Sequence, residues 1–220
     1  ESLGSSLDGK KAGTFGHAAM FSFCQNKLIT CGEGGMVVTN DKSLCEKMKM
    51  LRSHGRVEMD CDYFSSVDDN DYLELGYNYR MPSINAALGL SQMEKMESLT
   101  KKRREHAFFF NRAFRNLPIV CPVPPEGFQH VYQLYTIILA SESERDGLQQ
   151  FLKKKGIMTK IYFNPVHLKS FYRGRYKYKE GYLPNTESLS KKVLTLPLYV
   201  SMSKGDLDYI CRSVKEFFTR

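Results

Sequence analysis

The 220-residue sequence has no apolar run long enough to cross a bilayer, so we expect no membrane-spanning segment. It contains no C-x-x-C pair and no histidine at zinc spacing from a cysteine, which excludes the common zinc-binding patterns and predicts no metal site. Internal repeats and low-complexity segments are also missing. The first residue is Glu1 rather than methionine, so the missing signal peptide says nothing about the start of the protein.

Six cysteines are present, and none is spaced for a familiar metal or redox motif. They are Cys24, Cys31, Cys45, Cys61, Cys121 and Cys211. Free thiols in a reducing compartment explain this pattern better than a disulfide framework does. The cysteines therefore predict a cytoplasmic protein.

The composition is that of a folded chain, with 42% hydrophobic and 25% charged residues. The length suits one large domain, or one and a half. There are 32 Lys and Arg against 24 Asp and Glu, which gives a formal net charge of +8. This excess suits phosphate-bearing ligands, but it is spread along the chain without a nucleic-acid-binding motif. We therefore expect no nucleic-acid partner; steep salt-dependent binding to DNA or RNA would contradict this expectation.

The order of elements predicts an α/β fold. Glycine-bounded apolar runs at 18–23 and 36–39 have the length of buried strands, and Asp41 can cap a helix over 42–52. A strongly helical pattern begins at Pro82 and continues to 114. The second half alternates: strands at 132–139 and 157–163, an apolar run at 193–198, and helices at 143–155, 187–191 and 203–218, with Gly156 ending the first of these helices. A boundary inside the long helical stretch predicts two domains, 1–98 and 99–220.

Lys27 has the most specific local setting in the chain. It lies shortly after the apolar run 18–23 and precedes the glycine turn 32–35. Burial between such segments disfavours the charged form of an amine, and a neutral amine is what a carbonyl-capturing nucleophile needs. Lysines beside glycine turns are also common on protein surfaces, and spacing alone favours that alternative.

Three further side chains could bind ligands, and each has a structural alternative. The Ser22 hydroxyl could donate to a phosphate, or it could be a core serine satisfied by the backbone. Arg80 suits bidentate binding of a carboxylate or phosphate, or a salt bridge at a helix start. His167 follows a strand, where binding groups are frequent, but a satisfied structural histidine fits equally well. The aromatic stretch 171–182, with its four interleaved cations, could bind a base or sugar, or form a basic surface loop.

Several ordered segments together resemble the DegT/DnrJ/EryC1/StrS family of pyridoxal-phosphate-dependent sugar aminotransferases. The matching segments are 13–16, 21–23, Lys27, 32–41, 51–55, 75–81, 86–89 and 196–199. The resemblance covers essentially the whole chain. It implies the fold type I (aspartate aminotransferase-like) architecture, with part of the large cofactor-binding domain in 1–98. Residues 99–220 would be a long connecting helix and a small C-terminal α/β domain. Within the family, the chain is most similar to enzymes making 4-amino-4,6-dideoxy sugars on a nucleotide carrier, such as perosamine synthases.

The resemblance also assigns roles to residues at the cofactor. Lys27 matches the lysine that bonds covalently to pyridoxal 5'-phosphate and then carries the proton. Ser22 matches the serine that binds the cofactor phosphate. Glu1 aligns where many members have Gln or His near the cofactor ring hydroxyl. Asn78 matches an asparagine that reaches the cofactor phosphate of the neighbouring subunit, which implies a homodimer with an active site shared across the interface.

Arg80 and His167 match positions near the nucleotide-sugar substrate. The implied reaction moves an amino group, from glutamate in most relatives, to a keto group of a nucleotide-linked deoxysugar for cell-surface polysaccharide synthesis. In the family, an aspartate three positions before the residue matched by Glu1 pairs with the cofactor nitrogen. That position precedes this chain, so we expect the C-terminal part of a longer aminotransferase. The alternative is a truncated homologue that acts as a non-catalytic binding or regulatory module.

Overall fold

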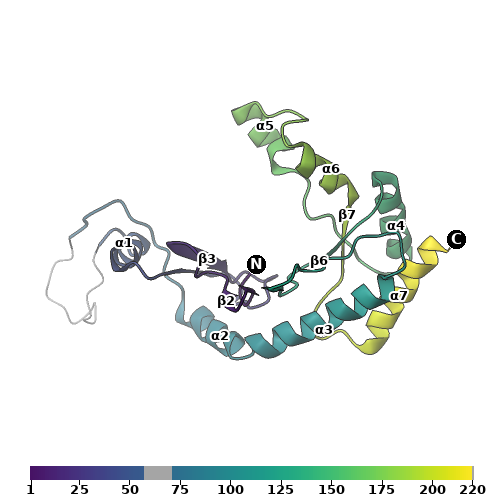
Figure 1. Cartoon of the computed structure of the whole chain (residues 1–220). Helices are drawn as coiled ribbons and strands as arrows, with labels where there is room; N and C mark the ends of the chain where they lie inside the picture. Colours follow the sequence, from purple (N-terminus) through teal and green to yellow (C-terminus); the bar gives the residue numbers. More distant parts are fainter. Residues whose placement is uncertain (57–70, 220) are drawn as a thin grey trace. The chain divides into compact units, whose positions relative to one another are not determined.

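The computed structural model describes residues 1–56 and 71–219, which form two compact units (Figure 1). The first unit contains Glu1–Ser98 and Gly127–Val131, and the second contains Leu99–Glu126 and Tyr132–Arg220. Both units mix helices with short strands, so the predicted α/β class is confirmed. In the described ranges, no helix is both long and apolar enough to cross a membrane.

The first unit is built around an antiparallel hairpin. Its elements are β1 (Ser6–Leu7), β2 (Lys10–Lys11), β3 (Ala18–Ser22), β4 (Gly35–Thr39), α1 (Lys42–Arg52), α2 (Ser83–Met93), the start of α3 (Met96–Phe114) and β5 (Phe128–Gln129). Strands β3 and β4 pair in register from Ala18 with Thr39 to Ser22 with Gly35. The chain between them, 23–34, carries Lys27.

The hairpin is less buried than its sequence predicts. Phe21 and Phe23 are buried, but Met20 is 79% exposed and Met36 is 51% exposed. The reason is that β3 and β4 pair only with each other among the strands that the structure describes. An apolar run shows that a segment can be buried, whereas its actual burial depends on what covers it.

Helix α1 begins and ends where the sequence predicts. The Asp41 carboxylate accepts a hydrogen bond from the Leu44 amide at 3.1 Å and caps the first turn. Beyond the C-cap Ser53, His54 and Gly55 both adopt positive φ, at 65° and 80°. The Gly55 amide then donates to the Met50 carbonyl at 2.9 Å, which reverses the chain direction.

The second unit packs helices around a two-stranded antiparallel sheet. Its elements are the rest of α3, β6 (Tyr135–Ile138), α4 (Glu142–Lys154), the 3-10 turn η1 (Val166–Leu168), α5 (Ser170–Tyr176), α6 (Pro184–Lys192), β7 (Val193–Leu196) and α7 (Lys204–Phe218). The core draws on α3, β6, α4, β7 and α7; its most buried members include Phe110, Phe114, Tyr135, Ile137, Leu148, Leu152, Leu194 and Val214.

The strand predicted at 157–163 is wrong. Only Lys160 pairs with a strand, as an isolated bridge to Thr195. Burial alternates at the start of this segment, where Ile157 is buried and Met158 is 86% exposed, but one bridge does not make the regular hydrogen-bond ladder of a sheet strand. The helix α5 was also missed, because a seven-residue segment with a central Gly174 and several aromatic residues has weak helical propensity.

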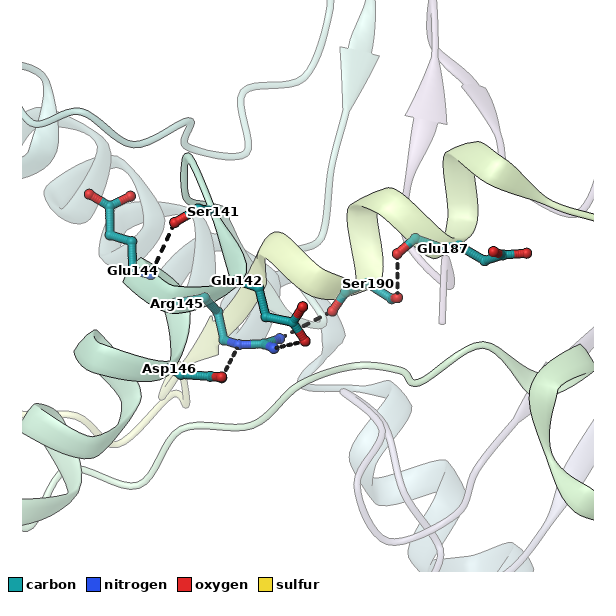
Figure 2. Close-up of polar contacts among 7 residues, drawn as sticks. All are labelled: Ser141, Glu142, Glu144, Arg145, Asp146, Glu187 and Ser190. Carbon is teal, nitrogen blue, oxygen red and sulfur yellow. Dashed lines mark hydrogen bonds and ion pairs between the residues drawn. The ribbon is translucent and has the colours of Figure 1, made fainter. Parts of the chain in front are cut away.

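Helix α6 is fixed to the start of α4 by one buried arginine (Figure 2). The Arg145 side chain is 5% exposed, and its Nη1 donates to the Ser190 carbonyl of α6 at 3.1 Å. The same guanidinium pairs with Asp146 at 2.6 Å and with Glu142 at 3.5 Å. Because a planar guanidinium offers five donors, one side chain can join both helices.

Candidate active site

Lys27 and Glu1 lie together, although 26 positions separate them in the sequence. The Lys27 Nζ is 2.5 Å from Glu1 Oε1, in an ion pair. The lysine side chain is 14% exposed, whereas the glutamate side chain is 51% exposed. The amine is therefore largely withdrawn from solvent and held at one defined point.

The ion pair shifts the titration of Glu1. The Lys27 ammonium donates a hydrogen bond to the carboxylate and adds a favourable charge interaction, which together lower the pKa of Glu1. Partial burial opposes this effect. Glu1 is therefore charged over the neutral pH range, and its negative charge faces the amine.

The loop that carries Lys27 is fixed at both ends and at its centre. The Phe23 amide donates to the Gly34 carbonyl at 2.8 Å, and the Cys31 amide donates to the Phe23 carbonyl at 3.0 Å. Two side chains of the loop itself, Ile29 and Cys31, are almost completely buried. Within the loop, the Lys27 amide donates to the Cys24 carbonyl at 3.1 Å and closes a tight turn.

Asn85 on α2 holds the glycine turn, and the sequence analysis did not identify it. Its Nδ2 donates to the Cys31 carbonyl at 3.0 Å and to the Glu33 carbonyl at 3.1 Å. Gly34 is tightly enclosed at this point, because a Cβ there would lie 2.5 Å from Cys31 Sγ. The sequence held one signal for this role: a side-chain amide in the first turn of a mostly apolar helix.

Ser22 ends β3, five residues before Lys27, and is partly buried. Its hydroxyl oxygen accepts the Cys24 amide at 3.4 Å. This bond leaves the hydroxyl hydrogen able to donate to a ligand. The hydroxyl and the amine therefore belong to one short, well-anchored segment.

Asn78 and Arg80 lie on a segment fixed to the end of α1. The Tyr77 and Tyr79 amides donate to the carbonyls of the last helical turn, at 2.7 and 2.9 Å, and Ser53 and Asn78 form an antiparallel bridge. The Tyr77 and Tyr79 rings are parallel at 4.9 Å. Arg80 Nη1 donates weakly to Ser53 Oγ at 3.4 Å. Both predicted binding side chains are exposed, on a backbone held by the helix.

His167 lies in the other unit and is engaged internally. The ring is buried, and its Nε2 is 2.9 Å from Glu187 Oε1. Hydrogen bonds from the Gly181 amide and from His167 lower the pKa of Glu187. This environment matches the structural alternative for His167, and its role toward substrate stays a prediction.

Comparison with known proteins places these features in a family. The sequence model of the DegT/DnrJ/EryC1/StrS aminotransferase family matches residues 1–215. A GDP-perosamine synthase from Escherichia coli O157:H7 is 36% identical over 219 residues, covering 100% of this chain and 57% of the relative.

Solved structures agree. Helicobacter pylori PseC, an aminotransferase involved in the biosynthesis of pseudoaminic acid, has a TM-score of 0.89 at 32% identity; 99% of this chain and 57% of that chain are covered. Streptococcus pneumoniae Spr1654 in its PLP form has a TM-score of 0.90 at 25% identity, with 99% and 55% covered.

The chain thus spans little more than half the length of these relatives. These neighbours confirm the expected fold type I architecture. Aminotransferases of this family depend on pyridoxal phosphate, in agreement with the cofactor that the sequence implied. The match over 215 of 220 residues shows that the chain belongs to the DegT/DnrJ/EryC1/StrS aminotransferase family.

Proposed function

We propose that this protein transfers an amino group from a donor, glutamate, to a keto group of a nucleotide-linked deoxysugar, with Lys27 as the catalytic amine. The observation that carries the proposal is the Lys27–Glu1 pair, in which a largely buried amine lies 2.5 Å from a carboxylate. Relatives named as a GDP-perosamine synthase and a spore coat polysaccharide biosynthesis protein support a nucleotide sugar and a role in cell-surface polysaccharide synthesis. Free thiols and such a substrate favour the cytoplasm.

The chain's own groups fit pyridoxal phosphate at this point. When bound, the cofactor supplies an electron sink for the carbon that loses its proton. Lys27 would hold the cofactor through its Nζ, and the same amine would carry the proton during the reaction. Glu1 positions Lys27 Nζ and, as a carboxylate, accepts the ammonium hydrogen bond. A protein that uses one site for both half-reactions follows ping-pong kinetics.

Ser22 and the loop backbone provide the phosphate site in this proposal. The Ser22 hydroxyl donates to a phosphate oxygen, and the glycine turn clamped by Asn85 lets the backbone approach closely.

Asn78 and Arg80 complete the site across a homodimer in this proposal. Asn78 reaches the cofactor phosphate of the neighbouring subunit, while Arg80 binds an anionic group of the substrate. The exposure of both side chains on a backbone fixed to α1 supports this arrangement. The family match gives His167 a role in substrate binding in this proposal, beside its pairing with Glu187.

The test is covalent trapping of the cofactor. The protein is incubated with pyridoxal phosphate, reduced with borohydride, digested and mapped by mass spectrometry. We expect one reduced cofactor per chain on Lys27, no label on Lys27→Ala, and normal labelling of the exposed-lysine control Lys42→Ala. Label spread over surface lysines, or an unchanged yield in Lys27→Ala, would overturn the assignment.

A half-reaction experiment separates catalysis from the binding-module alternative. With glutamate alone, the loaded protein should convert one equivalent of donor to 2-oxoglutarate, and a keto nucleotide sugar should then regenerate the starting form. Specific labelling of Lys27 without either half-reaction would favour the non-catalytic alternative.

A further inference from the structure

Four tyrosines in the second unit form a continuous row of ring contacts. The row, here called the tyrosine ladder, consists of Tyr172, Tyr176, Tyr178 and Tyr182. Successive ring centroids are 6.2, 5.8 and 5.7 Å apart. The first two rings are close to parallel, with an interplanar angle of 23°. These are distances at which aromatic rings attract one another.

The ladder is formed but not covered. Tyr176 is 54% exposed and Tyr182 is 60% exposed, while Phe171, beside Tyr172, is 67% exposed. Aromatic side chains normally bury most of their surface. A row of rings that stays accessible to solvent is therefore available to a ligand. Exposed aromatic platforms of this kind suit planar rings, which stack on them whatever their sequence or substituents.

Positive charge surrounds the ladder. Residues 169–182 contain five cations, Lys169, Arg173, Arg175, Lys177 and Lys179, against the single acid Glu180. Arg173, Arg175, Lys177 and Lys179 are all exposed, and no ion pair joins them to an acid within ranges 1–56 and 71–219. The Arg175 guanidinium lies 5.8 Å from the Tyr176 ring centroid. One cation thus lies over a ring of the ladder, and further exposed cations alternate with the tyrosines along the segment.

The segment is anchored, so the ladder is a fixed surface. Glu187 accepts the Gly181 amide at 2.8 Å and the Leu183 amide at 3.1 Å, and it pairs with His167 at 2.9 Å. The His167 ring also meets Tyr178 edge-on at 6.1 Å. Glu187 lies in the first turn of α6, which Arg145 fixes to α4 (Figure 2). The Tyr178–Tyr182 end of the ladder is therefore held before any ligand binds, which reduces the entropy lost on binding.

We infer that the tyrosine ladder, with Arg175, is a binding site for a nucleoside diphosphate: the base stacks on the tyrosine rings and the diphosphate pairs with the flanking cations. An aromatic face alone would suit many ligands, and a basic loop alone would suit any anion. Their combination on one anchored segment specifies a ligand that is planar at one end and doubly phosphorylated at the other. The inference rests on the proposed function, in which this ligand is the nucleotide half of the sugar substrate.

The test measures GDP binding by isothermal titration calorimetry, with guanosine and inorganic pyrophosphate as the two half-ligands. Stacking on one ring is worth about 1–3 kcal/mol, so Tyr176→Leu should weaken GDP binding about tenfold while Tyr176→Phe, which keeps the ring, should change it less than about threefold. Arg175→Gln should weaken GDP and pyrophosphate but leave guanosine unchanged. Arg212→Gln, an exposed arginine of α7, is the control and should bind GDP like the unchanged protein.

Each contrary result overturns a stated part of the inference. Equal affinity for GDP and pyrophosphate would mean an anion site without base stacking, and unchanged GDP binding by Tyr176→Leu would remove the ladder from the site. Far-UV circular dichroism of each variant establishes that the fold is intact. The Lys27 trapping experiment is read separately: label on Lys27 without GDP binding rejects this inference alone, and GDP binding without label rejects the proposed function alone.

Discussion

The Nζ of Lys27 and the Oε1 of Glu1 lie 2.5 Å apart, so two residues from distant parts of the chain share one hydrogen bond and one pair of charges. The bond lowers the pKa of the Glu1 carboxyl. The pair therefore stabilises the fold fully above the ordinary carboxyl pKa, and this stabilisation is lost as the pH falls through the lowered pKa. Replacing Lys27 with Met should therefore raise the Glu1 pKa toward its usual range. A carbon-detected NMR titration of the carboxyl group measures it.

Lys47→Met is the matched control for this titration, because Lys47 pairs with Glu74 instead. It should leave the Glu1 pKa where it is in the unchanged protein. An equal Glu1 pKa in Lys27→Met and the unchanged protein would show that the ion pair is not formed in solution.

Gly76 allows two backbone segments to touch, and alanine there should be destabilising. A Cβ on Gly76 would lie 1.8 Å from the Gly55 amide nitrogen and 2.3 Å from the His54 carbonyl carbon, both backbone atoms. Because backbone cannot swing aside as a flexible side chain does, we expect Gly76→Ala to lower the free energy of unfolding by about 1–3 kcal/mol. Urea denaturation measures the change; an unchanged midpoint would mean that the 74–79 segment does not pack against the end of α1.

Local chemistry made much of the secondary structure predictable. The helices starting after Asp41 and Ser203 have caps whose side chains accept amides of the first turn, and Gly156 follows the end of α4 with φ 73°. Each of these features depends on residues within a few positions of the helix end. The predicted strand at 157–163 failed because pairing needs a free edge along its whole length, and only Lys160 finds a partner there.

The site depends on contacts that no local pattern contains. Family resemblance named both Lys27 and Glu1, but their ion pair across 26 positions is visible only in the structure. The same holds for the Asn85 amide on the glycine turn and for the Glu187 carboxylate on His167. Long-range hydrogen bonds of this kind follow from the fold, and periodicity or spacing does not encode them.

Alanine should stabilise the protein at Gly174, whereas it should destabilise it at Gly76. It lies inside α5, its φ is not in the left-handed region, and a Cβ there would meet nothing within 4 Å. Because glycine costs a helix interior about 0.5–1 kcal/mol relative to alanine, Gly174→Ala should stabilise the helix that carries Tyr172 and Tyr176 by that amount. Hydrogen exchange of the α5 amides is the measurement, and slower exchange is the expected result. Faster exchange would show that the alanine disturbs the ladder.

Arg145 joins α4 to α6 from a position that is 4% exposed, so its removal should loosen the base of the anchored segment. Arg145→Met keeps much of the side-chain length but leaves the Ser190 carbonyl without its donor, while Glu142 and Asp146, each about half exposed, regain water. Loss of hydrogen bonds from a charged donor costs about 1.5–3 kcal/mol, which we expect as the drop in the free energy of unfolding. Urea denaturation measures it against Arg212→Met, whose exposed site should change stability by no more than about 0.5 kcal/mol. Equal stabilities of the two variants would show that the bridge between α4 and α6 contributes nothing to the free energy of unfolding. If Arg145→Met loses more stability and the hydrogen exchange of its Gly181 amide is also faster, the bridge supports the tyrosine ladder as well.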